Sequence, residues 1–223
     1  MPFGVDEAGK GPALGSMFAA AVNCEEPSDL PEGIRDSKRL TPERREELAA
    51  SLRADDGIAI GVAEITPARI DDPETDMNSL AVDAHASAIE RVVADLERTE
   101  ATSGSISGLC DACDTDADRF ARRVTAACSL EPLEIDARHG ADDDSPLVGA
   151  ASIVAKVERD AHVATLAEEY GEIGSGYPGD ATTREFLASY ADEHHELPPF
   201  ARESWSTCEE AIAAAEQTGL EQF

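Results

Sequence analysis

The sequence predicts an α/β protein in which a sheet with at least partly parallel strands lies among helices, followed by a helical C-terminal extension. Two observations predict this class. Segments typical of strands and of helices alternate between residues 78 and 170, the order that places helices against a parallel sheet, and helical segments follow after residue 180. The chain has 223 residues, 42% of them hydrophobic, so it can form a sizeable core despite a high net charge.

The N-terminal part of the chain contains three predicted strands and two predicted helices. Apolar runs bounded by turn-forming or charged residues predict the strands at residues 3–6, 17–24 and 58–65. Residues 42–54 form a helix in this prediction, because a threonine cap and a proline at the first turn open it. Residues 78–96 carry apolar side chains at steps of three and four, which is typical of a helix packed on a core.

The second half of the chain continues the alternation. Strands are expected at 106–112 and 132–138, helices at 116–128, 145–170, 182–195 and 206–217, and a Gly/Pro-rich break at 174–180. No repeat or long linker divides these elements. We therefore expect a catalytic core at residues 1–178 and a helical C-terminal extension at residues 179–223 that packs on the core.

The net charge is extreme. Lys and Arg number 18 against 47 Asp and Glu, which gives 18 − 47 = −29, and only three of the basic residues are lysines. Many acids, many alanines and 4% aromatic residues are typical of proteins from halophilic organisms, whose carboxylate-rich surfaces are tolerated when salt screens their repulsion. An acidic protein that binds basic partners is the alternative.

The cellular compartment can also be predicted. No run reaches the roughly 18 apolar residues of a membrane span, and the N-terminus is acidic where a signal peptide is basic, so we expect a cytoplasmic protein. The five cysteines are an odd number, which excludes a complete set of disulfides in a monomer. Cys110 and Cys113 have no second pair to complete a zinc site, and we expect all five cysteines to be small buried residues.

Two motifs partly match known ligand-binding loops, one for a nucleotide and one for calcium. Gly4-x4-Gly9-Lys10 fits a phosphate-binding P-loop, but Gly11 stands where a hydroxyl would hold Mg²⁺, and two acids lie inside the loop. A nucleotide-binding P-loop protein is thus our alternative function. The run that begins at Asp114 resembles a calcium loop but has Arg119 where the turn needs glycine, so we interpret it as acids at a helix N-terminus.

Four carboxylates lie at the ends of predicted strands or the start of a predicted helix. Asp6 and Glu7 follow the first strand, Asp111 ends the strand at 106–112, and Asp142 lies at the start of the long helix. Hard carboxylate oxygens suit Mg²⁺ or Mn²⁺, and four of them can hold two ions for phosphodiester displacement. Since 47 residues are acidic, some would lie at strand ends by chance.

Six blocks of sequence together resemble the archaeal type of ribonuclease HII, and they keep that family's order over nearly the whole chain. They read VDEAGKGP, DSKRLT, LCDACDTDADRFAR, ADD, GAASIVAKVERD and EEYGEIGSGYPGD. The resemblance implies a ribonuclease H-like fold, a mixed sheet flanked by helices. It also implies endonucleolytic cleavage of the RNA strand of RNA/DNA hybrids, and incision 5′ of single ribonucleotides in duplex DNA, with two Mn²⁺ or Mg²⁺ ions and 3′-hydroxyl and 5′-phosphate products.

The same resemblance assigns the site. It implies that Asp6, Glu7, Asp111 and Asp142 are the catalytic metal ligands, whereas Asp114, Asp116, Asp143 and Asp144 are expected to be solvated surface charge. The remaining implied contacts are with the substrate: the backbone of Gly9, Lys10 and Gly11 at the ribose, Tyr177 on the neighbouring sugar, and Ser37 and Lys38 at a phosphate. Separately, Ser152, Lys156 and Arg159 follow at steps of four and three on the long helix, and the face that they form either meets the substrate backbone or pairs with surface acids.

This chain departs from the family pattern at two positions. Lys10 stands where the family usually has arginine, so a bidentate fork is lost, and Gly149 stands where serine is common. His139, three residues before Asp142, is placed to assist proton transfer or product release, but a lone histidine in a turn is more often simply exposed, and the same is expected of His162, His194 and His195. Trp205 is expected to pack the extension onto the core. The expected partners are RNA/DNA hybrids and ribonucleotide-containing DNA, bound by a monomer without a membrane.

Overall fold

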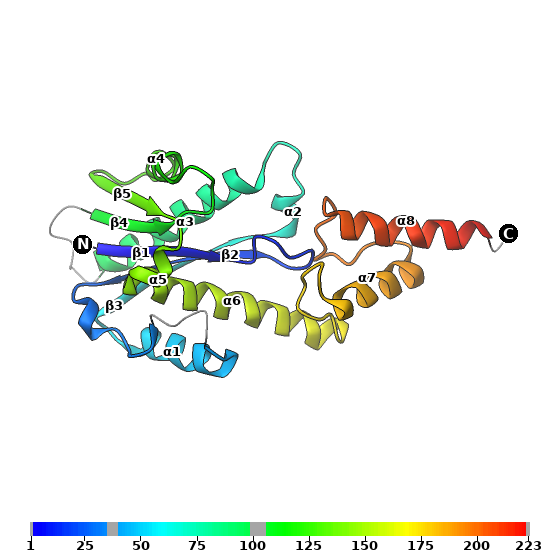
Figure 1. The fold of residues 1–223 in the computed structure, drawn as a ribbon, viewed down its shortest axis with the longest axis horizontal. Helices are drawn as coiled ribbons and strands as arrows, with labels where there is room; N and C mark the ends of the chain where they lie inside the picture. The colour runs from blue at the N-terminus through cyan, green and yellow to red at the C-terminus, as the bar shows by residue number, and fades with distance from the viewer. Residues whose placement is uncertain (1, 35–39, 99–105, 222–223) are drawn as a thin grey trace. The chain divides into compact units, whose positions relative to one another are not determined.

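The computed structural model describes residues 2–34, 40–98 and 106–221 (Figure 1). Its strands and helices lie close to the predicted ones, and three short helices are additional: η1, α2 and α5. In chain order the elements are β1 (Pro2–Ala8), β2 (Met17–Cys24), η1 (Pro27–Asp29), α1 (Pro42–Ala54), β3 (Ile58–Ile65), α2 (Pro67–Ile70), α3 (Met77–Arg98), β4 (Ile106–Asp111), α4 (Ala117–Ala127), β5 (Leu133–Arg138), α5 (Ala141–Asp144), α6 (Pro146–Tyr170), α7 (Ala181–His194) and α8 (Ser206–Glu221).

The chain divides into two compact units. The first, here the sheet unit, comprises Met1–Ala8, Phe18–Glu64 and Met77–Glu158. The second, here the C-terminal unit, comprises Gly9–Met17, Ile65–Asp76 and Arg159–Phe223. The separation into a core at 1–178 and an extension at 179–223 stays a prediction.

The sheet unit is built on five strands in the order β3-β2-β1-β4-β5. β1 pairs antiparallel with β2 and parallel with β4, and β4 pairs parallel with β5. The sheet is therefore mixed, and the prediction of partly parallel strands is confirmed. Because β1 and β4 are parallel neighbours, their carboxyl ends meet at the same edge of the sheet.

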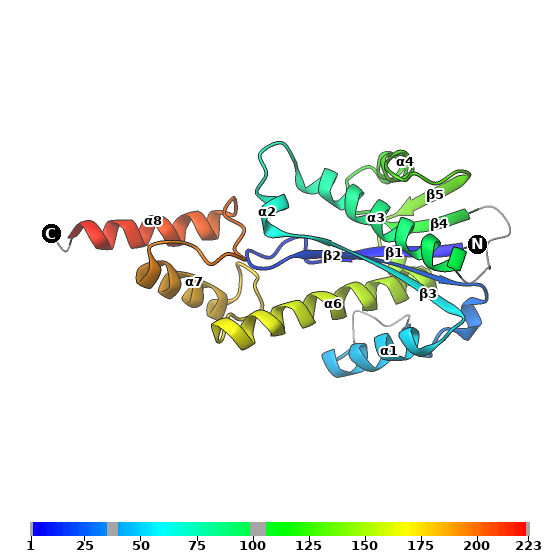
Figure 2. The same cartoon turned by 180° about the vertical axis from the view of Figure 1, so that it is seen from behind.

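Helices cover both faces of this sheet. α1 and α6 lie on one side and α3 and α4 on the other, as both views show (Figures 1 and 2). The first side contains a core of small and branched residues from β2, α1 and the first half of α6. Every residue of β2 is buried, which explains its alanine-rich sequence between two helical layers.

Two glycines let backbone segments of the sheet unit approach closely. A Cβ at Gly4 in β1 would lie 2.2 Å from the backbone nitrogen of Val148 in α6. A Cβ at Gly61 in β3 would lie 2.2 Å from the carbonyl oxygen of Ala88 in α3. Both glycines therefore set the distance between the sheet and a helix.

The C-terminal unit has a core of its own, formed by the loop after β1, the end of α6, α7 and α8. Leu14 bridges antiparallel to Ala201, so the loop and the segment before α8 pair along their backbones. The buried residues of this core are Ala13, Leu14, Ile173, Leu187, Phe200, Ala201 and Cys208.

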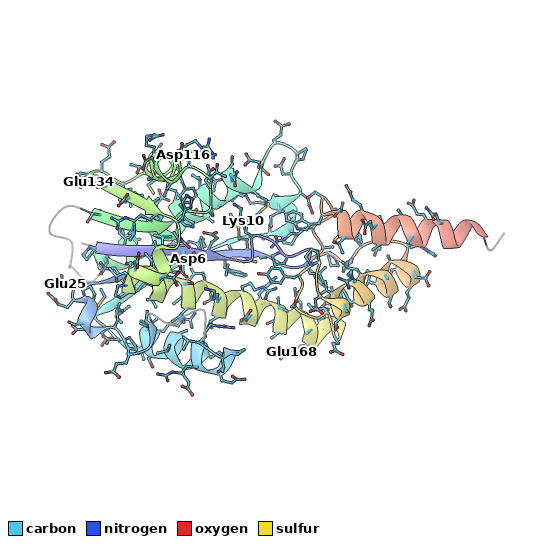
Figure 3. All side chains as sticks on the ribbon, in the orientation of Figure 1. Asp6, Lys10, Glu25, Asp116, Glu134 and Glu168 are labelled. Carbon is cyan, nitrogen blue, oxygen red and sulfur yellow. The ribbon has the colours of Figure 1, made fainter. Side chains whose placement is uncertain are left out.

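The surface carries the acids, as Figure 3 shows for Glu25, Asp116, Glu134 and Glu168, all of them exposed. In the part of the chain that the structure covers, none of the helices has the length and apolar character needed to cross a membrane. All five cysteines are free. Three are buried, but Cys113 and Cys128 are partly exposed, so the prediction of complete burial is wrong for those two.

Candidate active site

Three carboxylates of the sheet unit converge on one point. Asp6, Asp111 and Asp142 each offer a carboxylate oxygen, and these oxygens all lie within 4.8 Å of one another. Asp6 and Asp142 are buried, with exposed fractions of 6% and 2%, and Asp111 is half-buried. Three of the four carboxylates predicted from the sequence are thus brought together, at a spacing suited to a shared divalent cation.

The positions of these carboxylates follow from the sheet. Asp6 lies inside β1, because that strand runs two residues further than predicted, and Asp111 is the last residue of β4. Asp142 lies in α5, a short helix separate from the long helix that the sequence predicts to carry it. The Ala141 N–H donates to Asp111 Oδ1 at 3.0 Å, which ties α5 to the end of β4.

The negative charge of these three carboxylates favours either protonation or the binding of a cation. Burial, and next the negative charge of Glu7, raise the pKa of Asp6 well above its usual range. Burial also raises the pKa of Asp111, and the neighbouring charge of Asp142 adds to this. Such mutual repulsion is relieved when a divalent cation binds between the groups.

Ser152 and Lys156 on α6 support the charged form of Asp6. The Ser152 hydroxyl, which is fully buried, hydrogen-bonds the Asp6 carboxylate, and the Lys156 ammonium donates to Ser152 Oγ. The hydrogen bond and the positive charge of Lys156 both lower the pKa of Asp6 against the larger effect of burial. Direct substrate contact by Ser152 and Lys156 stays a prediction.

Glu7, the fourth predicted carboxylate, meets a histidine. His85 Nε2 lies 2.8 Å from Glu7 Oε2, and the ring of His85 contacts Phe120 edge-on at 5.0 Å between centroids. His85 is fully buried on α3, so its prediction as a core residue is confirmed. Its contact with Glu7 gives it a second role, as the partner that fixes this carboxylate.

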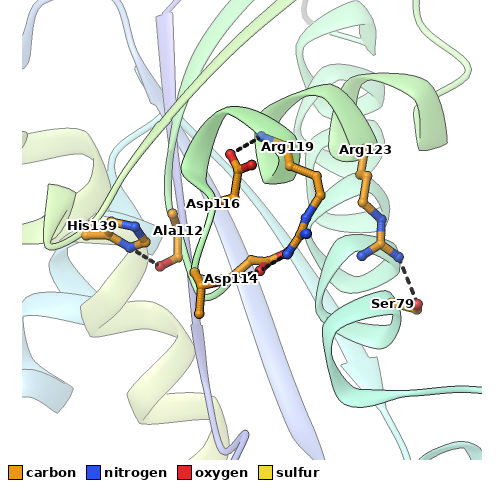
Figure 4. A network of polar contacts seen from close by, with 8 residues as sticks. Ser79, Ala112, Asp114, Asp116, Arg119, Arg123 and His139 are labelled. Carbon is orange, nitrogen blue, oxygen red and sulfur yellow. Dashed lines mark hydrogen bonds and ion pairs between the residues drawn. The ribbon is translucent and has the colours of Figure 1, made fainter.

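The acids after β4 form a local ion-pair network (Figure 4). Asp114 is 5% exposed and accepts from Arg119 Nε at 3.1 Å, so its prediction as solvated surface charge is wrong. That guanidinium holds the pKa of Asp114 down, at about 2. Asp116 caps α4 by accepting from the Arg119 N–H at 2.9 Å, which confirms its place at a helix N-terminus. The exposed His139 donates to the Ala112 carbonyl at 3.1 Å.

The predicted substrate residues of the C-terminal unit lie side by side. Gly9 has φ +88°, and a Cβ there would lie 2.9 Å from the Ser16 carbonyl oxygen, so glycine is required. A Cβ at Gly11 would lie 3.7 Å from Tyr177 Cε1. Tyr177 is 42% exposed, with the Arg159 guanidinium 4.9 Å from its ring centroid. An exposed tyrosine beside a glycine loop offers a flat apolar surface for a sugar.

Arg159 is held from within this unit. It is 9% exposed and donates to the Ser175 carbonyl, and its Nη1 contacts Asp160 at 3.1 Å. The sequence prediction placed Arg159 on a face with Ser152 and Lys156, but its guanidinium hydrogen-bonds the Ser175 carbonyl and lies over the ring of Tyr177. Ser37 and Lys38, the two predicted phosphate contacts, lie outside the described residues.

The sequence did not identify two residues of this unit, Arg202 and Trp205, as parts of the site. Arg202, which is fully buried, donates to the carbonyls of Gly9 and Lys10, and Trp205 Nε1 donates to the Gly11 carbonyl at 3.2 Å. The only sequence signal was a lone tryptophan three positions after an arginine. Neither residue belongs to a motif that links it to the loop at 9–11.

The P-loop alternative is wrong. Gly4 to Ala8 form part of β1, where a P-loop needs an open turn that wraps around phosphates. Gly149, the second departure from the family pattern, is crowded: a Cβ there would lie 3.2 Å from the Asp142 carbonyl oxygen and from Ile34. A larger side chain at this position would press on the turn that carries Asp142.

Known proteins resemble the chain over its whole length. The family model described as Ribonuclease HII matches residues 3–208. The chain is 56% identical to the ribonuclease HII of Haloarcula marismortui over 223 residues, which cover all of both chains. The crystal structure of ribonuclease H2 from Pyrococcus horikoshii has a TM-score of 0.83 at 33% identity, with 97% of this chain and 99% of that chain covered. In the PCNA:RNase HII complex from Archaeoglobus fulgidus, the similar chain has a TM-score of 0.79 at 32% identity, with coverage of 95% and 96%.

Proposed function

The chain belongs to the ribonuclease HII family of metal-dependent endonucleases, and from this membership we propose that it hydrolyses the RNA strand of RNA/DNA hybrids and incises duplex DNA 5′ of a single embedded ribonucleotide. The observation that carries the proposal is the convergence of Asp6, Asp111 and Asp142 at one edge of the sheet. Carboxylates so arranged serve phosphodiester hydrolysis. The products would carry a 3′-hydroxyl and a 5′-phosphate.

The residues present fit divalent cations. Oxygen donors from two rigid strand segments and a short helix suit Mg²⁺ or Mn²⁺. Burial, and next the Glu7 charge, raise the pKa of Asp6, and a bound cation would favour its ionised form against both effects. We assign Asp6, Asp111 and Asp142 as ligands and Glu7 as the fourth. Two bound ions would activate the attacking water and neutralise charge on the leaving 3′-oxygen.

The surrounding side chains keep this site ready for metal. Ser152 donates a hydrogen bond that favours the ionised form of Asp6, and Lys156 adds a positive charge behind it. His85 holds Glu7 from the other face of β1. Since the Ala141 N–H holds Asp111, three of the four proposed ligands, Asp6, Glu7 and Asp111, have a neighbour that fixes their charge or direction.

Recognition of the ribonucleotide is assigned to the C-terminal unit. A 2′-hydroxyl distinguishes RNA from DNA, and backbone groups of Gly9, Lys10 and Gly11 are suited to read it at close range. Tyr177 would pack on the neighbouring sugar, supported by Arg159. Cytoplasmic location and a monomeric state stay predictions.

A nicking assay tests the proposed function. The full chain is incubated in about 3 M KCl, where screening is nearly complete, with Mn²⁺ or Mg²⁺ and a labelled duplex that contains one ribonucleotide. We expect a single nick on its 5′ side and no nick in the all-DNA duplex. Asp111→Asn should fold normally but lose at least about 100-fold in rate, since a metal ligand is lost. A wild-type chain that leaves the duplex intact with either metal would refute the proposal.

A further inference from the structure

Arg202 in the C-terminal unit is a buried cation whose hydrogen bonds go to backbone carbonyls. Its residue is 0% exposed, and the described residues include no salt bridge to it. Burial, and next the positive charge of Arg159, lower its pKa to about 10. The charge of Asp71 opposes this lowering but does not outweigh it. Burying a charge that no carboxylate contacts directly is costly, so the hydrogen bonds of Arg202 must compensate.

Those contacts all serve one loop. Arg202 Nε donates to the Gly15 carbonyl at 2.9 Å, Nη1 to the Lys10 carbonyl at 3.0 Å and Nη2 to the Gly9 carbonyl at 2.6 Å. Trp205 stacks its ring 5.0 Å from the guanidinium and donates to the Gly11 carbonyl at 3.2 Å. The two side chains therefore hold three consecutive carbonyls, those of residues 9 to 11.

The geometry of the peptide bond determines where the N–H groups of this loop point. The loop's peptide bonds are trans, and in a trans peptide the N–H points opposite to the C=O. With the carbonyls of Gly9 and Lys10 turned to Arg202, the N–H groups of Lys10 and Gly11 point away from it. The next residue is Pro12, which has no N–H.

We propose that Arg202, assisted by Trp205, is a positioning residue that orients the Gly9–Lys10–Gly11 loop so that two adjacent amide N–H groups face the ribose and phosphate of the substrate. Two adjacent N–H groups beside a buried positive charge are suited to an oxygen-rich ligand. That the ligand is a ribonucleotide rests on the proposed function.

The proposal also explains why this position is an arginine. A guanidinium is planar and presents five N–H donors, which three carbonyls in different directions can share. A lysine ammonium is a compact point charge at the end of one stem. Lysine would keep the positive charge but would leave at least one of the three carbonyls unpaired.

The competing explanation is that Arg202 only stabilises the C-terminal unit. Leu187→Ala is the matched control, because Leu187 is fully buried in the core on which Trp205 packs and has no side-chain group that can hydrogen-bond the carbonyls of residues 9 to 11. Arg202→Met removes all the donors but keeps an apolar stem. Arg202→Lys and Trp205→Phe are milder changes that test the idea should Arg202→Met fail to fold.

Steady-state kinetics on the single-ribonucleotide duplex, with the full chain and Mn²⁺ in concentrated KCl, separate the two explanations. We expect KM to rise at least about tenfold in Arg202→Met and about threefold or more in Arg202→Lys and Trp205→Phe, with a smaller change in kcat. Leu187→Ala should lower Tm yet keep KM within about twofold of the wild type, and Mn²⁺ affinity should be unchanged in every variant.

Two results would overturn the inference. One is an unchanged KM in Arg202→Lys and Trp205→Phe, and the other is a KM in Leu187→Ala that rises as far as in the Arg202 variants. Failure of the proposed function gives a different result, because the wild-type chain would then not cut the duplex at all.

Discussion

Thr183 offers a sharp test of how the turn that carries Tyr177 is held. This residue of α7 is fully buried, and its hydroxyl accepts from the Gly176 N–H at 2.9 Å and donates to the Ile173 carbonyl at 3.0 Å. Gly176 has φ +79°, and its own carbonyl accepts from the N–H groups of Ala13 and Leu14. One hydroxyl therefore connects α7 to the turn and, through it, to the loop after β1.

Thr183→Val keeps the shape of the side chain but removes both hydrogen bonds. A buried backbone group left without a partner costs about 1–3 kcal/mol, so two such groups should lower the free energy of unfolding by about 2–6 kcal/mol. Thr183→Ser is the control: it keeps the hydroxyl and loses one methyl group, worth about 1 kcal/mol. Because only serine keeps the hydroxyl, we expect Thr183→Val to be less stable than Thr183→Ser, although valine is the more apolar residue.

Urea unfolding in concentrated KCl measures the difference. Trp205 is the sole tryptophan and lies in the same unit as Thr183, so its fluorescence reports the unfolding of that unit. The slope with urea should be the same in both variants, and only the midpoint should change. If Thr183→Val proves as stable as Thr183→Ser, the two hydrogen bonds do not hold the turn and the reasoning fails.

Three further predictions concern the sheet unit and the surface. The pKa values of Asp6 and Asp111 are raised, so both carboxylates should take up protons at a higher pH than an ordinary aspartate, whose pKa is about 3.9, and these protons should compete with Mn²⁺. Calorimetric titration with Mn²⁺ from pH 8 downward measures the affinity at each pH. An Mn²⁺ affinity that stays constant down to about pH 4.5 would contradict the prediction. His85→Leu should lower the free energy of unfolding by about 1–3 kcal/mol, because Glu7 loses its partner; circular dichroism during urea unfolding measures the change, and one below about 0.5 kcal/mol would count against the contact. The net charge of −29 predicts that Tm rises between dilute buffer and about 3 M KCl as carboxylate repulsion is screened; a flat thermal-scan result would remove the salt-adapted interpretation of the surface.

The sequence alone predicted the fold and the three carboxylates that converge at the sheet edge. Apolar periodicity located β1, β4 and their carboxyl ends, and parallel pairing then brought Asp6 and Asp111 together. The halophilic source was also predicted from composition, and the similarity to the Haloarcula marismortui protein confirms it. These features depend on local patterns that repeat over many residues.

Contacts between distant residues were beyond the sequence. His85 is 78 positions from Glu7, and Arg202 is 192 positions from Lys10. Periodicity assigned His85 to the core but gave no information on the group that its ring nitrogen would face. Asp114 was misjudged for a similar reason, because the Arg119 side chain folds back from the first turn of α4 to pair with it.

The glycine in the middle of β1 has a consequence for anyone who maps this enzyme by mutation. Gly4 has no side chain, yet any Cβ there would push β1 away from the turn of α6 that contains Val148. β1 carries Asp6, and the chain reaches α6 directly after the turn that carries Asp142. A screen for inactive variants would therefore recover Gly4 together with the carboxylates. A position of this chain that tolerates no substitution can therefore be one that sets the distance between backbone segments, as well as one whose side chain performs the chemistry.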